Sequence, residues 1–187
     1  MEREARRNIE EYVRPLAVGL DGVTNYGDVE RVVSAAEAIA AGEPVLDRDL
    51  LFLLAAFSGQ EKWVSRMGHR SRTEIFLASL RIAPRTVQRL FRGLARFETE
   101  PAAREEEIVH DAVLLDAMGA YGIAHGLADA YRERLSILEM AEAIEAAAGV
   151  PFRTEAGRRL GGARREVMLA FSRQLRAEHA EFARADK

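Results

Sequence analysis

The stretch that decides the fold lies at residues 105–126 and has the sequence EEEIVHDAVLLDAMGAYGIAHG. Between its glutamates and its first glycine nearly every residue is apolar, which leaves no polar face for a surface helix. This pattern predicts a helix buried in a protein core. It carries two carboxylates, Asp111 and Asp116, and acids on a core helix are either ion-paired or functional. Gly119 and Gly122 then allow a turn or the close approach of another helix.

A second apolar run indicates that this core is helical throughout. Residues 50–57, LLFLLAAF, are too few to span a bilayer and predict a central buried helix, with Asp47 or Asp49 as its N-cap. Helical spacing also predicts helices in residues 3–18, 29–40, 71–80, 84–97 and 126–148. A last helix is expected over residues 154–183. The residues predicted on its inner face are Leu160, Val167, Met168, Phe171 and Leu175.

Composition excludes several classes of protein. The net charge of −3, with 48% hydrophobic and 30% charged residues, fits a soluble globular protein and gives no reason to expect a nucleic-acid partner. No apolar run reaches the roughly 20 residues that span a membrane, and the first residues lack the apolar core of a signal peptide. The absence of cysteine excludes disulfides, thiolate zinc sites and cysteine nucleophiles. We therefore expect a cytoplasmic protein with no membrane partner.

Three motifs resemble those of one known family. DAVLLDAMGAYGIAHG, at residues 111–126, resembles the last signature of the HD-domain phosphohydrolase superfamily, in its small stand-alone bacterial branch, where D-A-D-x-L-D-A-x-G-A-x-G-I-A-R is typical. VERV, at residues 29–32, matches the opening motif, and residues 154–175 are similar to the closing one. The resemblance covers residues 21–175 and implies a single-domain all-α bundle of about seven to nine helices. We accordingly expect this domain over residues 21–187, after an N-terminal helical extension over residues 1–20.

The same resemblance implies a metal site that this chain departs from. Members of the family hold a divalent metal through a His, a His-Asp pair and a final Asp. The matching positions here hold Asp28, Phe57, Ser58 and Val113. Phenylalanine and valine have no donor atoms, and serine is a poor ligand unless ionised. Asp28 has two alternatives, as a ligand for a hard cation or as the N-cap of its helix. We therefore expect no bound metal, no other cofactor and no catalytic residue of the family type.

A remnant pocket is still expected around the charged residues of these motifs. Its predicted members are Asp28, Arg31, His69, His110, Asp111 and Asp116. Arg31 follows Asp28 by three residues on one helix face, so we expect an arginine, Arg31 first, to pair with at least one of the acids. For His69, a solvated or capping role is the alternative to metal ligation.

Two functions from different classes follow from this pattern. The leading hypothesis is a degenerate member of the family that acts as a binding or regulatory module, with an unknown small ligand, a protein partner or a second copy of itself. The alternative is a metal-dependent phosphohydrolase, acting on a nucleotide or other phosphomonoester through a site rebuilt from the remnant pocket. A purely structural subunit is a third alternative. In residues 87–97, VQRLFRGLARF, the spacing predicts an apolar core face and a solvated arginine face rather than RNA binding.

Overall fold

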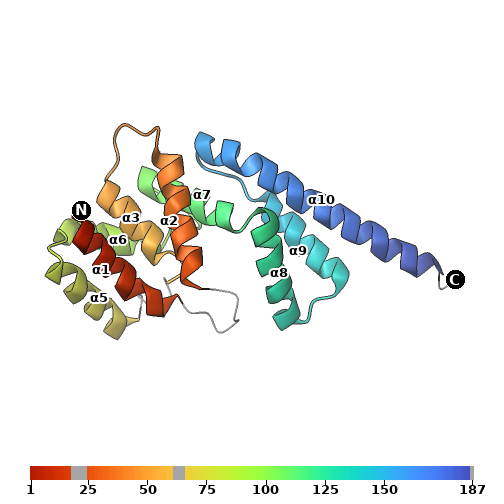
Figure 1. Cartoon of the computed structure of the whole chain (residues 1–187), viewed down its shortest axis with the longest axis horizontal. Coiled ribbons are helices and arrows are strands. Elements are labelled where there is room, and N and C mark those ends of the chain that lie inside the picture. The colour runs from red at the N-terminus through yellow and green to blue at the C-terminus, as the bar shows by residue number, and fades with distance from the viewer. Residues whose placement is uncertain (18–24, 61–65, 186–187) are drawn as a thin grey trace. The chain divides into compact units, whose positions relative to one another are not determined.

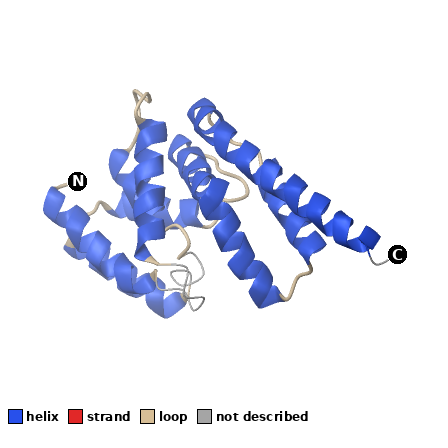
Figure 2. Cartoon of the chain, turned by 45° about the vertical axis from the view of Figure 1, so that its right-hand side comes forward, coloured by secondary structure: helices blue, strands red, loops and turns tan. Residues whose placement is uncertain are grey.

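The structure is a computed structural model that describes residues 1–17, 25–60 and 66–185. All regular structure in these ranges is helical, with nine α-helices, one short 3-10 helix and no strand (Figures 1 and 2). The predicted all-α class is confirmed for this part of the chain. None of its helices is both long and apolar enough to cross a membrane.

The chain divides into two compact units, Met1–Val113 and Leu114–Lys187. The first contains α1 (Arg3–Val13), η1 (Arg14–Leu16), α2 (Tyr26–Ala40), α3 (Arg48–Phe57), α5 (Met67–Ser79), α6 (Pro84–Leu94) and the larger part of α7 (Arg104–Asp116). The second contains the end of α7, then α8 (Gly119–Glu133), α9 (Ile137–Gly149) and α10 (Glu155–Ala185). The domain boundary expected between residues 20 and 21 lies outside the described residues and stays a prediction.

The core of the first unit is built around α3. All residues from Leu50 to Phe57 are buried, as the unbroken apolar run predicts. The helix begins where the Asp47 side chain accepts a hydrogen bond from the Leu50 amide at 3.0 Å. Of the two predicted N-caps, Asp47 and Asp49, the structure therefore has Asp47. Helix α2 packs along α3, and α1 and α6 also contact it. Because neighbouring helices cover α3 on several sides, it has no solvent-facing side that would favour polar residues, and residues 50–57 are all apolar.

The second buried segment, α7, confirms the prediction in its first half. Residues from Ile108 to Ala112 are buried, and so are Leu115 and Met118. Val113 and Leu114 are half-buried, and Ala117 is exposed. Expecting the whole run to be buried was therefore wrong at its end, where α7 stops at Asp116.

The two glycines after α7 make the turn into α8. Gly119 has a φ of +74°, in the left-handed region that side chains disfavour. A Cβ on Gly122 would lie 2.0 Å from the Ala117 carbonyl oxygen, so only glycine lets the first turn of α8 approach the end of α7 this closely. The expected turn and close approach are both present.

The long helix α10 runs beside α9 and also contacts α8 (Figure 1). Its buried face contains Gly161, Met168 and Ser172, whereas Leu160 and Val167 are exposed. The predicted inner face was thus wrong for these two residues. The reason is that a glycine takes an inner position, where a Cβ would lie 2.2 Å from the ring of Phe152.

Candidate functional site

The first position where the HD family has a metal ligand lies in the first turn of α2. Here Asn25 is the N-cap, and its side chain accepts from the Gly27 amide at 2.8 Å. Asp28 is the third residue of the helix, and its Oδ2 accepts from the Asn25 amide at 2.6 Å, which completes a capping box. The prediction that Asp28 is itself the N-cap was wrong by three residues, because Asn25 supplies the cap from the preceding extended backbone.

The predicted pairing of Asp28 with Arg31 is present. The guanidinium of Arg31 donates to Oδ1 of Asp28, three residues earlier on the same helix. Each carboxylate oxygen of Asp28 therefore already accepts a hydrogen bond, one from the backbone and one from the arginine. A cation that bound through this carboxylate would compete with the cap and the ion pair for its negative charge.

The second position is filled by an aromatic side chain. Phe57 is the last residue of α3 and is 0% exposed. Its ring lies 6.3 Å from that of Tyr12, which stacks on Phe76 with a centroid distance of 4.1 Å. The hydroxyl of Tyr12 is in turn 3.0 Å from Oγ1 of Thr73. This cluster of three rings joins α1, α3 and α5, and Phe57 itself offers a metal ion no lone pair.

The third position caps the end of α3. Ser58 is buried, and its hydroxyl donates to the carbonyl oxygen of Ala55 at 2.8 Å. This bond satisfies one of the carbonyls that the end of a helix leaves without a partner. Gly59 follows with a φ of +79° and turns the chain away. Ser58 thus has a structural contact that accounts for its burial.

The fourth position lies on α7, next to a buried histidine and acid. Val113 is half-buried and has no donor atom. Two residues earlier, Asp111 is 0% exposed, and its Oδ1 lies 2.9 Å from Nδ1 of His110, which is also buried. His110 is thus a neighbour of this acid, while the arginine expected to pair with at least one acid of the remnant pocket is Arg31, at Asp28.

The other two predicted pocket residues are on α5 and at the end of α7. His69 is in the first turn of α5, where its backbone carbonyl accepts from the Thr73 hydroxyl at 3.0 Å. Asp116 is the last residue of α7 and belongs to the second unit. Among the residues that the structure describes, no three histidines or acids come close enough together to hold a metal ion. The donor set at the family's ligand positions therefore does not fit a divalent metal.

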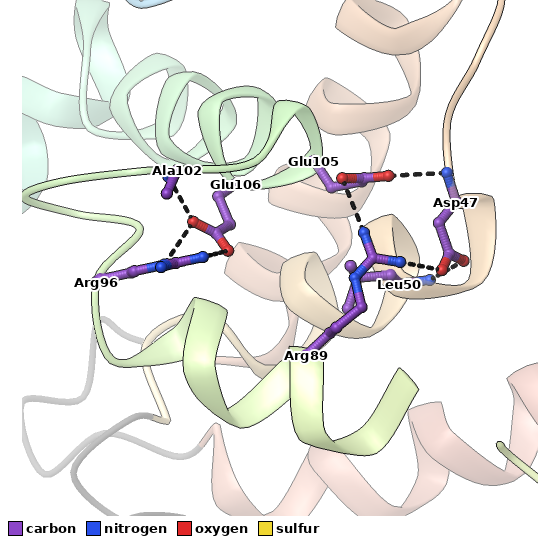
Figure 3. Close-up of polar contacts among 7 residues, drawn as sticks. All are labelled: Asp47, Leu50, Arg89, Arg96, Ala102, Glu105 and Glu106. Carbon is purple, nitrogen blue, oxygen red and sulfur yellow. Dashed lines mark hydrogen bonds and ion pairs between the residues drawn. The ribbon is translucent and has the colours of Figure 1, made fainter. Parts of the chain in front are cut away.

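The most extensive charged cluster is one that the sequence did not indicate (Figure 3). Glu106, in the first turn of α7, is 4% exposed and accepts two hydrogen bonds from Arg96, at 2.9 and 2.8 Å. It also accepts from the Ala102 amide at 2.7 Å. Burial raises the pKa of Glu106, but the hydrogen bonds from Arg96 and the backbone outweigh this and hold that pKa below its ordinary value.

A second arginine, Arg89, links α6 to the starts of both α7 and α3 through ion pairs. Arg89 donates to Oδ2 of Asp47 at 2.7 Å and to Oε2 of Glu105 at 3.3 Å. The other oxygen of Glu105 accepts from the Asp47 amide at 2.8 Å, and the other oxygen of Asp47 caps α3 through Leu50. Figure 3 shows Arg89, on α6, and Arg96, two residues past the end of α6, pointing to these acids. Arg92 and Arg96 are exposed, as the predicted solvated face requires, and Arg89 is half-buried; the ion pairs of Arg89 and Arg96 were not expected.

The fold that carries these four positions on α2, α3 and α7 is similar to that of solved HD-superfamily hydrolases. An HD-superfamily hydrolase from Bacillus thuringiensis matches 96% of this chain and 99% of its own, with a TM-score of 0.73 and 18% identity. The Lin1889 protein from Listeria innocua matches 96% of this chain and 98% of its own, with a TM-score of 0.78 and 17% identity.

A third similar structure is YpgQ from Bacillus subtilis in complex with ADP. It matches 94% of this chain and 95% of its own, with a TM-score of 0.71 and 20% identity. No protein-family model matches the sequence, and no curated protein is significantly similar to it. The resemblance that the motifs indicated is thus confirmed at the level of the fold.

Proposed function

We propose that this chain is a binding or regulatory protein on the HD fold, without the metal-dependent hydrolysis of that class. The observation that carries the proposal is Phe57. Where the family has a metal-binding histidine, this side chain is fully buried in a ring cluster with Tyr12 and Phe76. A metal ion needs donor atoms, and a phenylalanine packed against other rings provides none.

The three other ligand positions support the same proposal. Val113 has no donor atom, and the hydroxyl of Ser58 already donates to Ala55. Asp28 is the one residue of the four that a hard cation would accept, and both its oxygens are engaged in the cap and the Arg31 ion pair. A single carboxylate holds a hydrated cation weakly, because such ions require several oxygen ligands.

A nucleotide is the ligand class that we propose first. YpgQ, of the same fold, is known in complex with ADP. A chain without the metal-binding side chains can keep a pocket shaped for a nucleotide. It would then bind the nucleotide as a sensor of nucleotide concentration and would not hydrolyse it. A protein partner or a second copy remains the alternative occupant. We place the protein in the cytoplasm as part of the same proposal, from its cysteine-free composition.

One observation favours a second candidate, the metal-dependent phosphohydrolase. His110 and Asp111 lie 2.9 Å apart and are buried in the helix that carries the family's final ligand position. Histidine and aspartate are both common metal ligands, and they could be two members of a rebuilt site. Such a site would still need a third ligand beside them.

Turnover and binding assays separate the two candidates. The purified protein is tested on a set of nucleotides and phosphomonoesters with added Mn²⁺, with and without a chelator, and ADP binding is measured by isothermal titration calorimetry. The proposal predicts no chelator-sensitive turnover, together with ADP binding that does not depend on Mn²⁺. Turnover that the chelator abolishes, and that His110→Ala also abolishes, would establish the enzyme instead. Without turnover and without ADP binding, the protein-partner alternative replaces the nucleotide.

A further inference from the structure

The helical pair α5 and α6 is strongly basic in a chain that is acidic as a whole. Residues 66–97 contain eight arginines and a single acid, Glu74, whereas the whole chain has a net charge of −3. The one acid pairs with Arg70 on its own helix, at 3.0 Å. Helix α6 itself contains no acid. It carries three of the segment's eight arginines, and Arg96 follows two residues after its end, so the helix and the turn that follows it are basic.

Four arginines of this segment line one cavity. It has a volume of about 270 Å³ and is lined by Arg85, Arg89, Arg92, Arg96, Ala103 and Glu106. Arg85, Arg89 and Arg92 follow one another by four and three residues, a spacing that puts them on one face of α6, and Arg96 follows four residues later, past the end of the helix. Like charges at such spacings repel each other and destabilise a helix. On the solvated face of α1, by contrast, Arg6 pairs with Glu10 and Arg7 with Glu11. Solvation alone therefore does not explain a row of arginines without acids between them.

Two of the four arginines are fixed by buried acids. Arg96 is held by Glu106 and Arg89 by Glu105 and Asp47. Glu106 is the one acid among the cavity's lining residues, and its two oxygens already accept from Arg96 and Ala102. These contacts hold two guanidinium groups in place along the cavity and leave them with further N–H donors, since a guanidinium has five.

The other two arginines have no acid partner within residues 1–17, 25–60 and 66–185. Arg85 and Arg92 are exposed, and neither forms an ion pair in this part of the chain; Arg92 has a 3.4 Å hydrogen bond to the Gln88 carbonyl of its own helix. They lie two helical turns apart, about 10 Å along the axis, on either side of Arg89. Their long side chains can therefore reach the two sides of a ligand that Arg89, between them on the helix, contacts at its centre.

We propose that this cavity binds the phosphate groups of a small phosphorylated molecule, with Arg85 and Arg92 as the groups that clamp it. Guanidinium groups match phosphate oxygens through paired hydrogen bonds, and several of them together favour an anion with more than one charge. The volume is just below the roughly 300–1,000 Å³ of small-molecule pockets, which suits a phosphate or diphosphate group. Phe91 and Phe97 on the same segment are buried, so no aromatic platform for stacking nucleic-acid bases is exposed.

This proposal does not depend on the proposed function. None of the cavity's residues occupies a ligand position of the family, so the cavity would serve an enzyme or a binding protein equally. It differs from the remnant pocket in its residues and in the element that supplies them.

Binding of inorganic pyrophosphate to the full chain tests the proposal, by isothermal titration calorimetry at low and high NaCl. The test variant is Arg85→Gln/Arg92→Gln, which leaves every buried ion pair intact. The control is Arg72→Gln/Arg173→Gln, which removes the same charge from two exposed arginines outside the cavity. Circular dichroism confirms that both variants are folded.

We expect the wild type to bind pyrophosphate, the test variant to bind it at least about tenfold more weakly, and the control to bind as the wild type does. Raising the NaCl concentration should weaken the binding, because exposed charges are screened. No binding to the wild type, or an equal loss in both variants, would overturn the proposal. So would binding of an acidic peptide or of RNA by a chain that does not bind pyrophosphate.

Discussion

Two regions of the first unit differ in whether they contain buried charge. At the end of α3, Phe57 and its ring partners occupy the place where the fold otherwise has a metal ligand. At the start of α7, Glu105 and Glu106 are buried and each is bound by an arginine of the segment that begins with α6. The difference shows that this chain keeps buried carboxylates where its own side chains neutralise them. Where a metal ion would be needed, the donor atoms are missing.

The largest effect should come from removing the ring that replaces the metal ligand. We expect Phe57→Ala to lower the free energy of unfolding by about 3–5 kcal/mol, because it leaves a cavity where a fully buried ring was packed. Urea unfolding followed by circular dichroism measures the change. Ile75→Ala, at a side chain that is 71% exposed, is the control and should change little. A loss below about 1 kcal/mol for Phe57→Ala would mean that this position is not part of the packed core.

The ion pair of the other region should rank next. Arg96→Ala leaves Glu106 buried without its guanidinium, and we expect a loss of about 2–3 kcal/mol, reduced from that of a fully buried pair because Arg96 is 43% exposed. Arg92→Ala, on the same helix, should cost less than about 0.5 kcal/mol. In Arg96→Ala/Glu106→Leu, much of the loss should be recovered, since no charge is left buried. Equal losses for Arg92 and Arg96 would contradict the contrast between the two arginines.

The pH dependence of stability distinguishes the charged region from the apolar one. The pKa of Glu106 in the folded protein lies below its ordinary 4.5, so its ionised form stabilises the fold above that pH. This contribution is lost as the pH falls from about 4.5 towards the lowered value. Free energies of unfolding at pH 7 and pH 4 should therefore differ more in the wild type than in Glu106→Gln. Phe57→Ala should keep the pH dependence of the wild type, and the reverse ranking would contradict the account.

The smallest effect should be at the cap of α2. Asn25→Ala and Asp28→Ala each remove one half of the capping box, and we expect a loss of about 1 kcal/mol for either. Ser34→Ala, at an exposed position in the middle of α2, is the control. Adding Mn²⁺ should leave the thermal midpoint of the wild type unchanged. A midpoint that rises with Mn²⁺ in the wild type but not in Asp28→Ala would show that Asp28 is a metal ligand after all.

The sequence predicts the fold well because the fold depends on local patterns. The unbroken run from Leu50 to Phe57 can only be a buried helix, and the spacing of Arg31 from Asp28 already indicates an ion pair. The capping role of Asp28 was assigned to the wrong position, since Asn25 competes for it from an equally suitable place. The side of α10 that is buried was misjudged because glycine contributes nothing to an apolar pattern.

The α6–α7 cluster could not be predicted, because its partners are far apart in the sequence. Arg89 binds acids 42 and 16 residues away, and Arg96 binds one 10 residues away. Nothing in residues 87–97 distinguishes the two paired arginines from Arg92. The glutamates before the apolar part of α7 were a signal, but acids at the start of a helix also have a local explanation in the helix dipole.

The most direct test of the central claim is the metal content of the protein. The chain is purified without chelators, incubated with excess Mn²⁺, desalted and analysed by inductively coupled plasma mass spectrometry, beside the variants Asp28→Ala and Asp111→Ala. The account predicts far less than one metal ion per chain and the same trace amount in all three proteins. One ion per chain in the wild type, lost in either variant, would show that a metal site exists and that Phe57 and Val113 do not abolish it.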